Sequence, residues 1–515
     1  MGGAARRARH GGRSRRPARG RAGAGVELTQ EQRAIVAEAR SGASFKVPAF
    51  AGTGKTATLV AVADAIAPRP TLYLAFNTAM AREARTRFAG RRHVSVLTAH
   101  ALAFRQVGHV FAQRLEPRAW AISRAIAARF TGELSRLAET TDGGAQIALG
   151  TIQKFEASGA ARILPEHVVE DHRARVAAET IAEAAERIWR AMVEPDSDLP
   201  VSHDTYFKAW QVAGADLGAW QTIFFDEAQD ASGAMLAVLE SARGHQRIFV
   251  GDAHQQLYRF RGAVNAMQSI ALPAFPLTQS WRFGSAIAKV ANFILEAKGE
   301  RLEVKGAPAR HDVVVRRSGR PPTAVVARTN AGLFDEALEA IGREAAPRIG
   351  VVGGAEELLR MVLGAHELRH TGRSSHPAFR FFRSWAQLEE TTKGPQGSEY
   401  GPFVQIVKRY GSALPELCGR VRQACVDVKE ADLVLSTVHK FKGKESAHVR
   451  LAGDFRPFCY RDRRTGKPCI DEDEANVQYV AVTRAEQILE LGSYADALVS
   501  ALECRAKMPP LAKGG

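Results

Sequence analysis

Residues 47–56 read VPAFAGTGKT, and this stretch decides the fold of the chain. A short apolar run precedes it and a helical segment, 57–66, follows it, which is the strand, loop and helix order that a phosphate-binding loop requires. Backbone amides at the start of such a helix bind phosphate groups. We therefore expect Lys55 to reach the β- and γ-phosphates of a nucleotide and the Thr56 hydroxyl to bind Mg²⁺.

The loop departs from the pattern GxxxxGK[ST] at its first glycine, which is Ala49 in this chain. A glycine-rich turn without a ligand is the alternative, but the flanking strand and helix favour a nucleotide site. The departure points to a subfamily of phosphate-loop proteins. The loop residues that we expect to bind ATP are Ala49, Phe50, Ala51, Gly52, Thr53, Gly54, Lys55 and Thr56.

A second stretch, IFFDEAQD at 223–230, places carboxylates at the end of an apolar strand. Asp226 can bind Mg²⁺ through water, and Glu227 can orient and deprotonate an attacking water molecule. An ordinary strand end with solvated acids is the alternative interpretation. The phosphate loop upstream favours the catalytic one.

Around these motifs, short apolar runs alternate with helical segments, which is typical of buried parallel strands with helical crossovers. This order predicts an α/β fold with two lobes, each carrying an insertion. The expected strands are 45–47, 71–76, 94–98, 223–225 and 247–250 in the first lobe, and 323–327, 433–436, 449–452 and 488–491 in the second.

The composition is that of a soluble globular protein: 45% of the 515 residues are hydrophobic and 24% are charged. No apolar run approaches the roughly 18 residues of a membrane helix, so we expect a cytoplasmic protein, associated with the nucleoid if the source is bacterial. The net charge of +16 favours a polyanionic partner. Five cysteines without a CxxC pair argue against a disulfide framework or a zinc site.

The first 25 residues carry eight arginines, and no acidic residue precedes Glu27. This composition cannot bury enough apolar surface to fold, and it predicts a disordered basic arm. The arm is either an auxiliary nucleic-acid tether or a solvated leader.

The motifs occur in one order along the chain, and together they resemble the UvrD/Rep class of superfamily 1 helicases. DEAQD and AGTGKT are the first to carry this resemblance. The others are LTQEQ at 28–32, LAFNTAMAREA at 74–84, LTAHALA at 97–103, GDAHQQLYRFRGA at 251–263, LTQSWRFG at 277–284, TVHKFKGKE at 437–445 and QYVAVTRA at 478–485. The sequences of these motifs are closer to those of the F-box DNA helicase branch than to those of UvrD itself, although we expect no F-box segment before the motor.

For the ATP site, the resemblance implies that Arg282 and Arg484 approach the γ-phosphate as arginine fingers and that Gln255 senses it. Gln32 would hydrogen-bond adenine, Trp281 would stack on it, and Glu445 would contact the nucleotide. The expected catalytic residues are Lys55, Asp226, Glu227, Gln255, Arg282 and Arg484, and the expected Mg²⁺ ligands are Thr56 and Asp226.

For DNA, the resemblance implies that Tyr258 and Phe260 stack on bases and that Arg261 links the DNA cleft to the nucleotide. Aromatic stacking is worth roughly 1–3 kcal/mol per base and accepts any base, which suits a motor that steps without reading sequence. Packing of these rings in the core is the alternative. The full set of expected DNA contacts is Phe76, Asn77, Thr98, His100, Tyr258, Phe260, Arg261, Thr437 and His439.

The implied architecture is two RecA-like P-loop lobes with parallel sheets, each with a mainly helical insertion. We expect the first lobe at 26–104 and 220–273, its insertion at 105–219, the second lobe at 274–365 and 431–505, a short accessory insertion at 366–430 and a tail at 506–515. The accessory insertion contains a basic and aromatic patch, 370–385, that either contacts nucleic acid or is a solvated face with a buried Trp385.

These features predict an ATP- and Mg²⁺-dependent DNA helicase or translocase that moves 3′ to 5′ and acts in repair or recombination. The expected partners are single-stranded DNA and tailed or forked duplexes. A remodeller that strips recombinase filaments with little unwinding would carry the same motor motifs. A nucleic-acid-binding module with an inactive motor is disfavoured because every catalytic residue type is present. The residues leave RNA as a track, and the oligomeric state, open.

Overall fold

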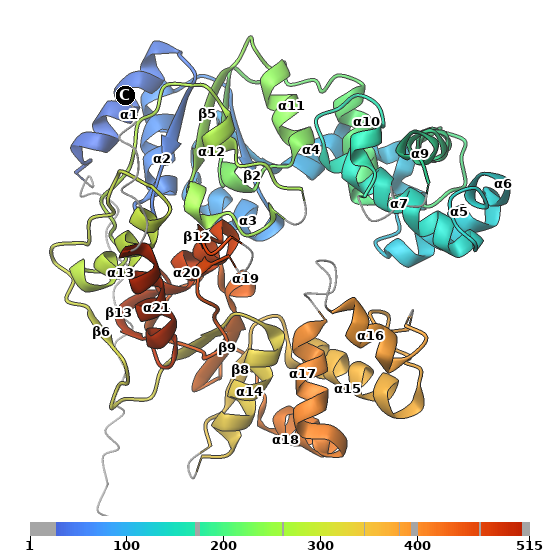
Figure 1. Cartoon of the computed structure of the whole chain (residues 1–515). Coiled ribbons are helices and arrows are strands. Elements are labelled where there is room, and N and C mark those ends of the chain that lie inside the picture. The colour runs from blue at the N-terminus through green and yellow to red at the C-terminus, as the bar shows by residue number, and fades with distance from the viewer. Residues whose placement is uncertain are drawn as a thin grey trace, which may run out of the picture.

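The computed structural model describes residues 27–169, 176–259, 262–343, 346–380, 382–392, 400–462 and 465–506. The predicted basic arm and nearly all of the predicted tail lie outside these residues. Figure 1 shows two α/β lobes, one above the other, with two groups of helices on the same side of them. Within the described ranges, no helix combines the length and the apolar character that crossing a membrane demands.

The first lobe is built on a five-stranded sheet in which every strand pair is parallel. Strands buried on both faces of a sheet are continuously apolar, which is why the sequence predicted all five. Their order is β1 (Phe45–Pro48), β5 (Gln246–Gly251), β4 (Thr222–Phe225), β2 (Thr71–Ala75) and β3 (Val94–Thr98).

Helices cover both faces of this sheet because successive strand side chains point to opposite faces. Tyr73 and Phe224 belong to one buried cluster, while Leu72 and Ile223 belong to another. The first cluster includes α1 (Gln30–Ser41), α2 (Lys55–Ile66) and α3 (Thr78–Arg87). The second includes α4 (Ala99–Gln106), α11 (Gly233–Ser241) and α12 (Ala266–Ser269).

The first helical insertion lies between β3 and β4 in sequence and shares the second of these clusters. The expected start at residue 105 falls inside α4, whereas the expected end at 219 falls in the segment between α10 and β4. The described helices are η1 (Gly108–Arg114), α5 (Ala119–Arg129), α6 (Thr131–Leu134), α7 (Thr141–Ala157), η2 (Pro165–His167), α9 (Ala178–Val193) and α10 (His203–Val212).

The second lobe contains a six-stranded sheet whose strand pairs are also all parallel. Its order is β6 (Val313–Val315), β13 (Ala485–Glu490), β10 (Ser446–Leu451), β7 (Ala324–Ala327), β9 (Leu433–Thr437) and β8 (Ile349–Val351). One face is covered by α13 (Ser285–Ala297), α20 (Glu472–Val482) and α21 (Tyr494–Ala506), and the other by α14 (Asn330–Ile341) and α15 (Ala355–Thr371). The two parallel sheets confirm the predicted α/β fold.

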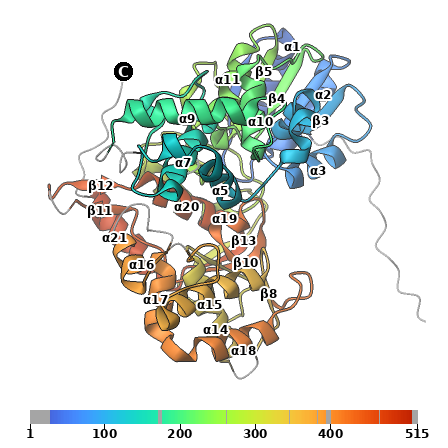
Figure 2. The same ribbon diagram turned by 90° about the vertical axis from the view of Figure 1, so that its right-hand side faces the viewer.

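The second insertion lies between β8 and β9, and its helices lie below those of the first insertion in both Figure 1 and Figure 2. Its expected start at residue 366 falls inside α15, a continuous helix that begins at Ala355. The other helices are α16 (Trp385–Thr391), α17 (Gly401–Tyr410), η7 (Gly411–Ala413) and α18 (Leu414–Ala424). A small hairpin, β11 (Cys459–Arg461) with β12 (Pro468–Ile470), follows β10.

The chain crosses from the first lobe to the second in a segment that runs alongside β1 and the phosphate loop. The amide of Phe275 donates to the Lys46 carbonyl at 2.9 Å, and that of Leu277 donates to the Pro48 carbonyl at 2.8 Å. The amide of Trp281 donates to the Gly52 carbonyl, also at 2.8 Å. Residues 275–281 are therefore tied to the first lobe, although the sequence placed the lobe boundary at 273.

Candidate ATP site and DNA-binding surface

The phosphate loop leaves β1 at Ala49 and enters α2 at Lys55. Gly52 and Gly54 have φ values of +75° and +83°, a left-handed conformation that favours glycine. Ala49 is buried, and its amide donates to the Gly251 carbonyl at 2.9 Å. The Phe50 ring stacks on His254 with centroids 6.1 Å apart. Ala49, at which the loop departs from the usual pattern, thus packs in the core, and so does its neighbour Phe50.

Lys55 meets the acidic end of β4. Its Nζ donates to Glu227 Oε1 at 2.6 Å, and Glu227 Oε2 accepts a hydrogen bond of 2.6 Å from the Gln229 side chain. Asp226 Oδ2 accepts a hydrogen bond of 2.5 Å from the Tyr73 hydroxyl on β2. The motifs predicted that Lys55, Asp226 and Glu227 meet. The role of Tyr73 was missed because its strand was read as a buried apolar run.

The charges at this point favour a divalent cation. Burial works to lower the pKa of Lys55, but the carboxylates Glu227, Asp226 and Asp252 raise it above its ordinary value. Burial and the charge of Glu227 raise the pKa of Asp226. Burial opposes ionisation of Glu227 as well, yet Lys55 and Lys442 hold its pKa below the usual range. Two buried acids, Asp226 and Asp252, and the partly buried Glu227 surround Lys55, and they fit a site in which Asp226 helps to bind Mg²⁺, an ion that prefers oxygen ligands.

Glu227 has an unusual backbone conformation. Its φ of +54° makes it the single non-glycine residue with positive φ in the described part of the chain. Non-glycine residues in this region of φ/ψ space cost of order 1–3 kcal/mol and cluster at functional sites. The strain accompanies the turn from β4 into η3 (Ala228–Asp230) and directs this carboxylate toward Lys55.

The second lobe contributes two arginines to the same site. Arg484 is 1% exposed, and its Nη2 atom lies 3.4 Å from Gln255 Oε1. Burial and the neighbouring charge of Arg282 lower the pKa of Arg484 to about 9. Arg282 donates to Glu445 Oε2 at 2.6 Å and to the Thr483 carbonyl at 3.0 Å. Predicted residues that are up to 229 positions apart in sequence are therefore neighbours.

Two residues that the sequence did not single out complete the joint between the lobes. The Tyr479 hydroxyl accepts a hydrogen bond from the Ala51 amide at 3.2 Å and donates to Asp252 Oδ2 at 3.2 Å. The same Asp252 oxygen accepts from the Gln255 side chain at 2.7 Å. Tyr479 and Asp252 both lie inside motifs identified in the sequence. Their position in these motifs was therefore the one feature of the sequence that could have pointed to them.

Gln32 and Trp281, the expected adenine contacts, lie at the same end of α2. A Cβ atom built on Gly54 would be 3.7 Å from Gln32 Nε2 and 3.9 Å from Trp281 Cδ1. The Gln32 side chain closes a capping box with Thr29 and donates to Thr58 Oγ1 at 3.0 Å. The Trp281 side chain is 48% exposed, so one of its faces is accessible to a base.

Three expected DNA contacts form an aromatic cluster across the two lobes. The Phe76 and Tyr258 rings are stacked, with centroids 5.8 Å apart. Tyr258 also lies 6.2 Å from the ring of His439, which is part of α19 (Val438–Phe441) in the second lobe. Phe76 is 39% exposed, so the cluster reaches the surface. This arrangement suits stacking on nucleic-acid bases.

Other expected DNA contacts have partners within the protein. The Asn77 and Thr98 side chains cap α3 and α4 by accepting hydrogen bonds of 2.9 and 3.1 Å. His100 bonds Asp204 at 3.0 Å and stacks on an aromatic ring of α10. Thr437 is 7% exposed at the start of α19. Phe260 and Arg261 lie outside the described residues.

The predicted basic and aromatic patch divides in two. The Trp385 ring packs partly buried against the second lobe's core, with the Arg369 guanidinium 5.3 Å from its centroid. The Arg380 guanidinium instead lies 4.5 Å from the centroid of Trp120, a residue of α5. The two helical insertions therefore touch each other. Phe381 lies outside the described residues.

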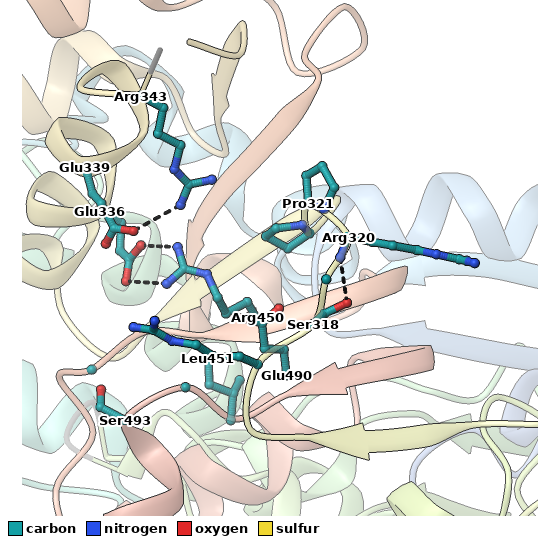
Figure 3. Close-up of a pocket in the computed structure, with 15 residues that line it drawn as sticks. Ser318, Arg320, Pro321, Glu336, Glu339, Arg343, Arg450, Leu451, Glu490 and Ser493 are labelled. Atoms are coloured by element: carbon teal, nitrogen blue, oxygen red, sulfur yellow. Dashed lines mark hydrogen bonds and ion pairs between the residues drawn. The ribbon is translucent and has the colours of Figure 1, made fainter. Parts of the chain in front are cut away.

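A cavity of about 610 Å³ in the second lobe is lined by charged side chains but contains none of the predicted residues. Arg450 points at Glu336, and Arg343 bonds Glu339 at 3.0 Å (Figure 3). These ion pairs satisfy charges within the cavity wall. The residues for which the sequence predicts catalysis lie instead at the joint between the lobes.

Comparison with known proteins agrees with this geometry. Residues 28–271 match the UvrD/REP helicase N-terminal domain. In an alignment of 510 positions that covers 90% of this chain, the chain is 32% identical to the F-box DNA helicase 1 of Gallus gallus and covers 49% of it. In an alignment of 520 positions that covers 93% of this chain, it is 28% identical to the F-box DNA helicase protein 1 of Schizosaccharomyces pombe and covers 58% of it. The chain thus spans about half the length of the curated relatives it matches.

Proposed function

We propose that this chain is a UvrD-like superfamily 1 helicase and that it hydrolyses ATP to move along DNA, on the basis of its match to the UvrD/REP helicase N-terminal domain and its similarity to the two F-box DNA helicases. The observation that carries the proposal is the contact of Arg484, in the second lobe, with Gln255, in the first. An ATP site that is completed by both lobes couples hydrolysis to lobe movement, which is what a nucleic-acid motor requires.

In the proposed reaction, amides of the phosphate loop bind the ATP phosphates, and Lys55 turns from Glu227 to the β- and γ-phosphates. Glu227 then orients the attacking water and accepts its proton. Arg282 and Arg484 stabilise the charge that develops on the γ-phosphate. Thr56 and Asp226 would hold Mg²⁺, which neutralises charge on the phosphate oxygens when it is bound.

For the track, we propose single-stranded DNA, with movement from 3′ to 5′ and strand separation on tailed or forked duplexes. The cluster of Phe76, Tyr258 and His439 supports this choice because its rings can stack on successive bases. The proposed cellular role is DNA repair or recombination. Removal of recombinase filaments is an activity that the same motor would drive.

The test is ATPase activity with and without single-stranded DNA. We compare wild type with Lys55→Ala, Glu227→Gln and Arg484→Ala, because arginine fingers in related sites contribute about 10³–10⁵ in rate. Each variant should lose at least about 100-fold in DNA-stimulated kcat. Wild-type turnover in all three variants, or a wild type that DNA does not stimulate, would refute the proposal.

A further inference from the structure

Lys442, a residue outside the predicted site, reaches from the second lobe into the acidic end of β4. Its ammonium group pairs with Asp230, whose side chain is 1% exposed, and lies 3.6 Å from Glu227 Oε2. It also donates to the Gln255 carbonyl at 2.8 Å. A cation that is itself 13% exposed therefore bridges the lobes at the proposed general base.

In this arrangement, both oxygens of Glu227 are engaged. Lys55 occupies Oε1, and Gln229 and Lys442 approach Oε2. Binding of ATP would draw Lys55 to the phosphates and free the first oxygen. Lys442 caps α19 in the other lobe, so a displacement of α19 would draw it away from the second oxygen.

The same lysine touches the aromatic cluster. The Nζ of Lys442 lies 5.7 Å from the Tyr258 ring centroid, and the His439 ring, 6.2 Å from Tyr258, is carried three residues earlier on α19. The Tyr258 and His439 rings are tilted by 58°, and stacked atoms lie about 3.5 Å apart, so a base between them needs the two rings parallel and about 7 Å apart. We infer that entry of a base between Tyr258 and His439 moves α19, and with it Lys442, which caps this helix.

We propose that Lys442 is the positioning residue that makes hydrolysis depend on DNA. Without DNA, Lys442 holds the carboxylates of Glu227 and Asp230, so that Glu227, the general base, does not reach the attacking water. A nucleic-acid base that enters between Tyr258 and His439 displaces α19, which withdraws Lys442 and releases Glu227. This inference rests on the proposed function and adds to it the contact through which the track controls the ATP site.

The test measures ATPase kcat and KM without DNA and with saturating oligo(dT). Lys442→Met should raise the DNA-free kcat by at least about fivefold, the factor that corresponds to the lower end of typical coupling free energies. Its KM for ATP should stay within about twofold of the wild-type value. Stimulation by DNA should fall by the same factor. Lys442→Arg keeps the charge and should restore stimulation to within about twofold of wild type.

Lys440→Met is the matched control, because Lys440 lies on α19, the helix that Lys442 caps, but pairs with Glu357 at 3.3 Å, away from the ATP site. It should behave as wild type. If Lys442→Met is unstable because Asp230 loses its partner, the double variant Asp230→Asn, Lys442→Met removes both charges and should show the same DNA-free rise.

Two outcomes separate this inference from the proposed function. A wild type that DNA does not stimulate refutes the proposed function itself. A stimulated wild type, with a DNA-free kcat in Lys442→Met that is unchanged or lower than wild type, overturns the role of Lys442 alone.

Discussion

Replacing Tyr479 with phenylalanine removes a single hydroxyl from the joint between the lobes. That hydroxyl bonds the Ala51 amide and Asp252 Oδ2, each at 3.2 Å, and all three residues are at most 1% exposed. The substitution leaves the ring in place, so packing is retained. It leaves the Ala51 N–H without its partner whenever the lobes are together.

The size of the effect follows from the cost of a buried unpaired donor, about 1–3 kcal/mol. In an open form of the joint, water can bond the Ala51 amide, so the cost falls on the closed form alone. At 1.4 kcal/mol for each factor of ten, the ratio of the closed form to the open form drops by about 5- to 150-fold. If hydrolysis needs the closed form, the kcat/KM for ATP falls by the same factor.

The assay is steady-state ATPase at saturating single-stranded DNA, with Tyr494→Phe as the control. Tyr494 is 1% exposed and donates to Gln478 Oε1 at 2.7 Å within the second lobe. Its variant should lower the thermal unfolding midpoint and leave kcat/KM unchanged. A Tyr479→Phe enzyme with kcat/KM within twofold of wild type, or a loss shared equally by both variants, would refute the reasoning.

Three further predictions concern stability and nucleotide affinity. Gly332→Ala should lower the free energy of unfolding by about 1–3 kcal/mol, because its Cβ would lie 2.1 Å from Asp454 Oδ2. Gly419→Ala, in open space on a helix, should instead raise it by about 0.5–1 kcal/mol. Urea unfolding measures both changes, and a change of the same sign in both variants would contradict this. Burial raises the pKa of Glu156 from 4.5 to about 8, so the folded state keeps a proton that the unfolded state releases, and stability should fall as the pH rises through this window. The Glu156→Gln variant should lack that decline. If the unfolding free energies of wild type and Glu156→Gln fall equally with pH, Glu156 is not the titrating group. Trp281→Ala should raise the KM for ATP by about 2- to 12-fold through lost stacking, and an unchanged KM would exclude Trp281 as the adenine contact.

Most of the fold was predictable because both sheets are parallel and buried on two faces. β7, β9, β10 and β13 were found as apolar runs, as were all five strands of the first sheet. β6 and β8 were missed because each has three residues, too few for a pattern. Boundaries inside helices were misplaced because α15 runs without interruption from the lobe into the insertion.

The site was predictable where a motif carries the chemistry and unpredictable where the role depends on a partner. Lys55 and Arg484 could be named because their neighbours in sequence are distinctive. Tyr73 could not, since a tyrosine in a buried strand shows its hydrogen bond only when the facing carboxylate is known. Asn77 and Thr98 follow strands, where residues of these types also cap helices, so sequence alone does not distinguish a cap from a DNA contact.

The central claim is directional, ATP-driven movement along single-stranded DNA, and streptavidin displacement measures it without requiring strand separation. The protein is mixed with oligonucleotides that carry biotin and streptavidin at the 5′ or the 3′ end. We predict ATP-dependent release that is faster from the 5′ end, and none with Lys55→Ala. Release that is as fast or faster from the 3′ end, that does not require ATP, or that is as fast with Lys55→Ala as with wild type would contradict the account.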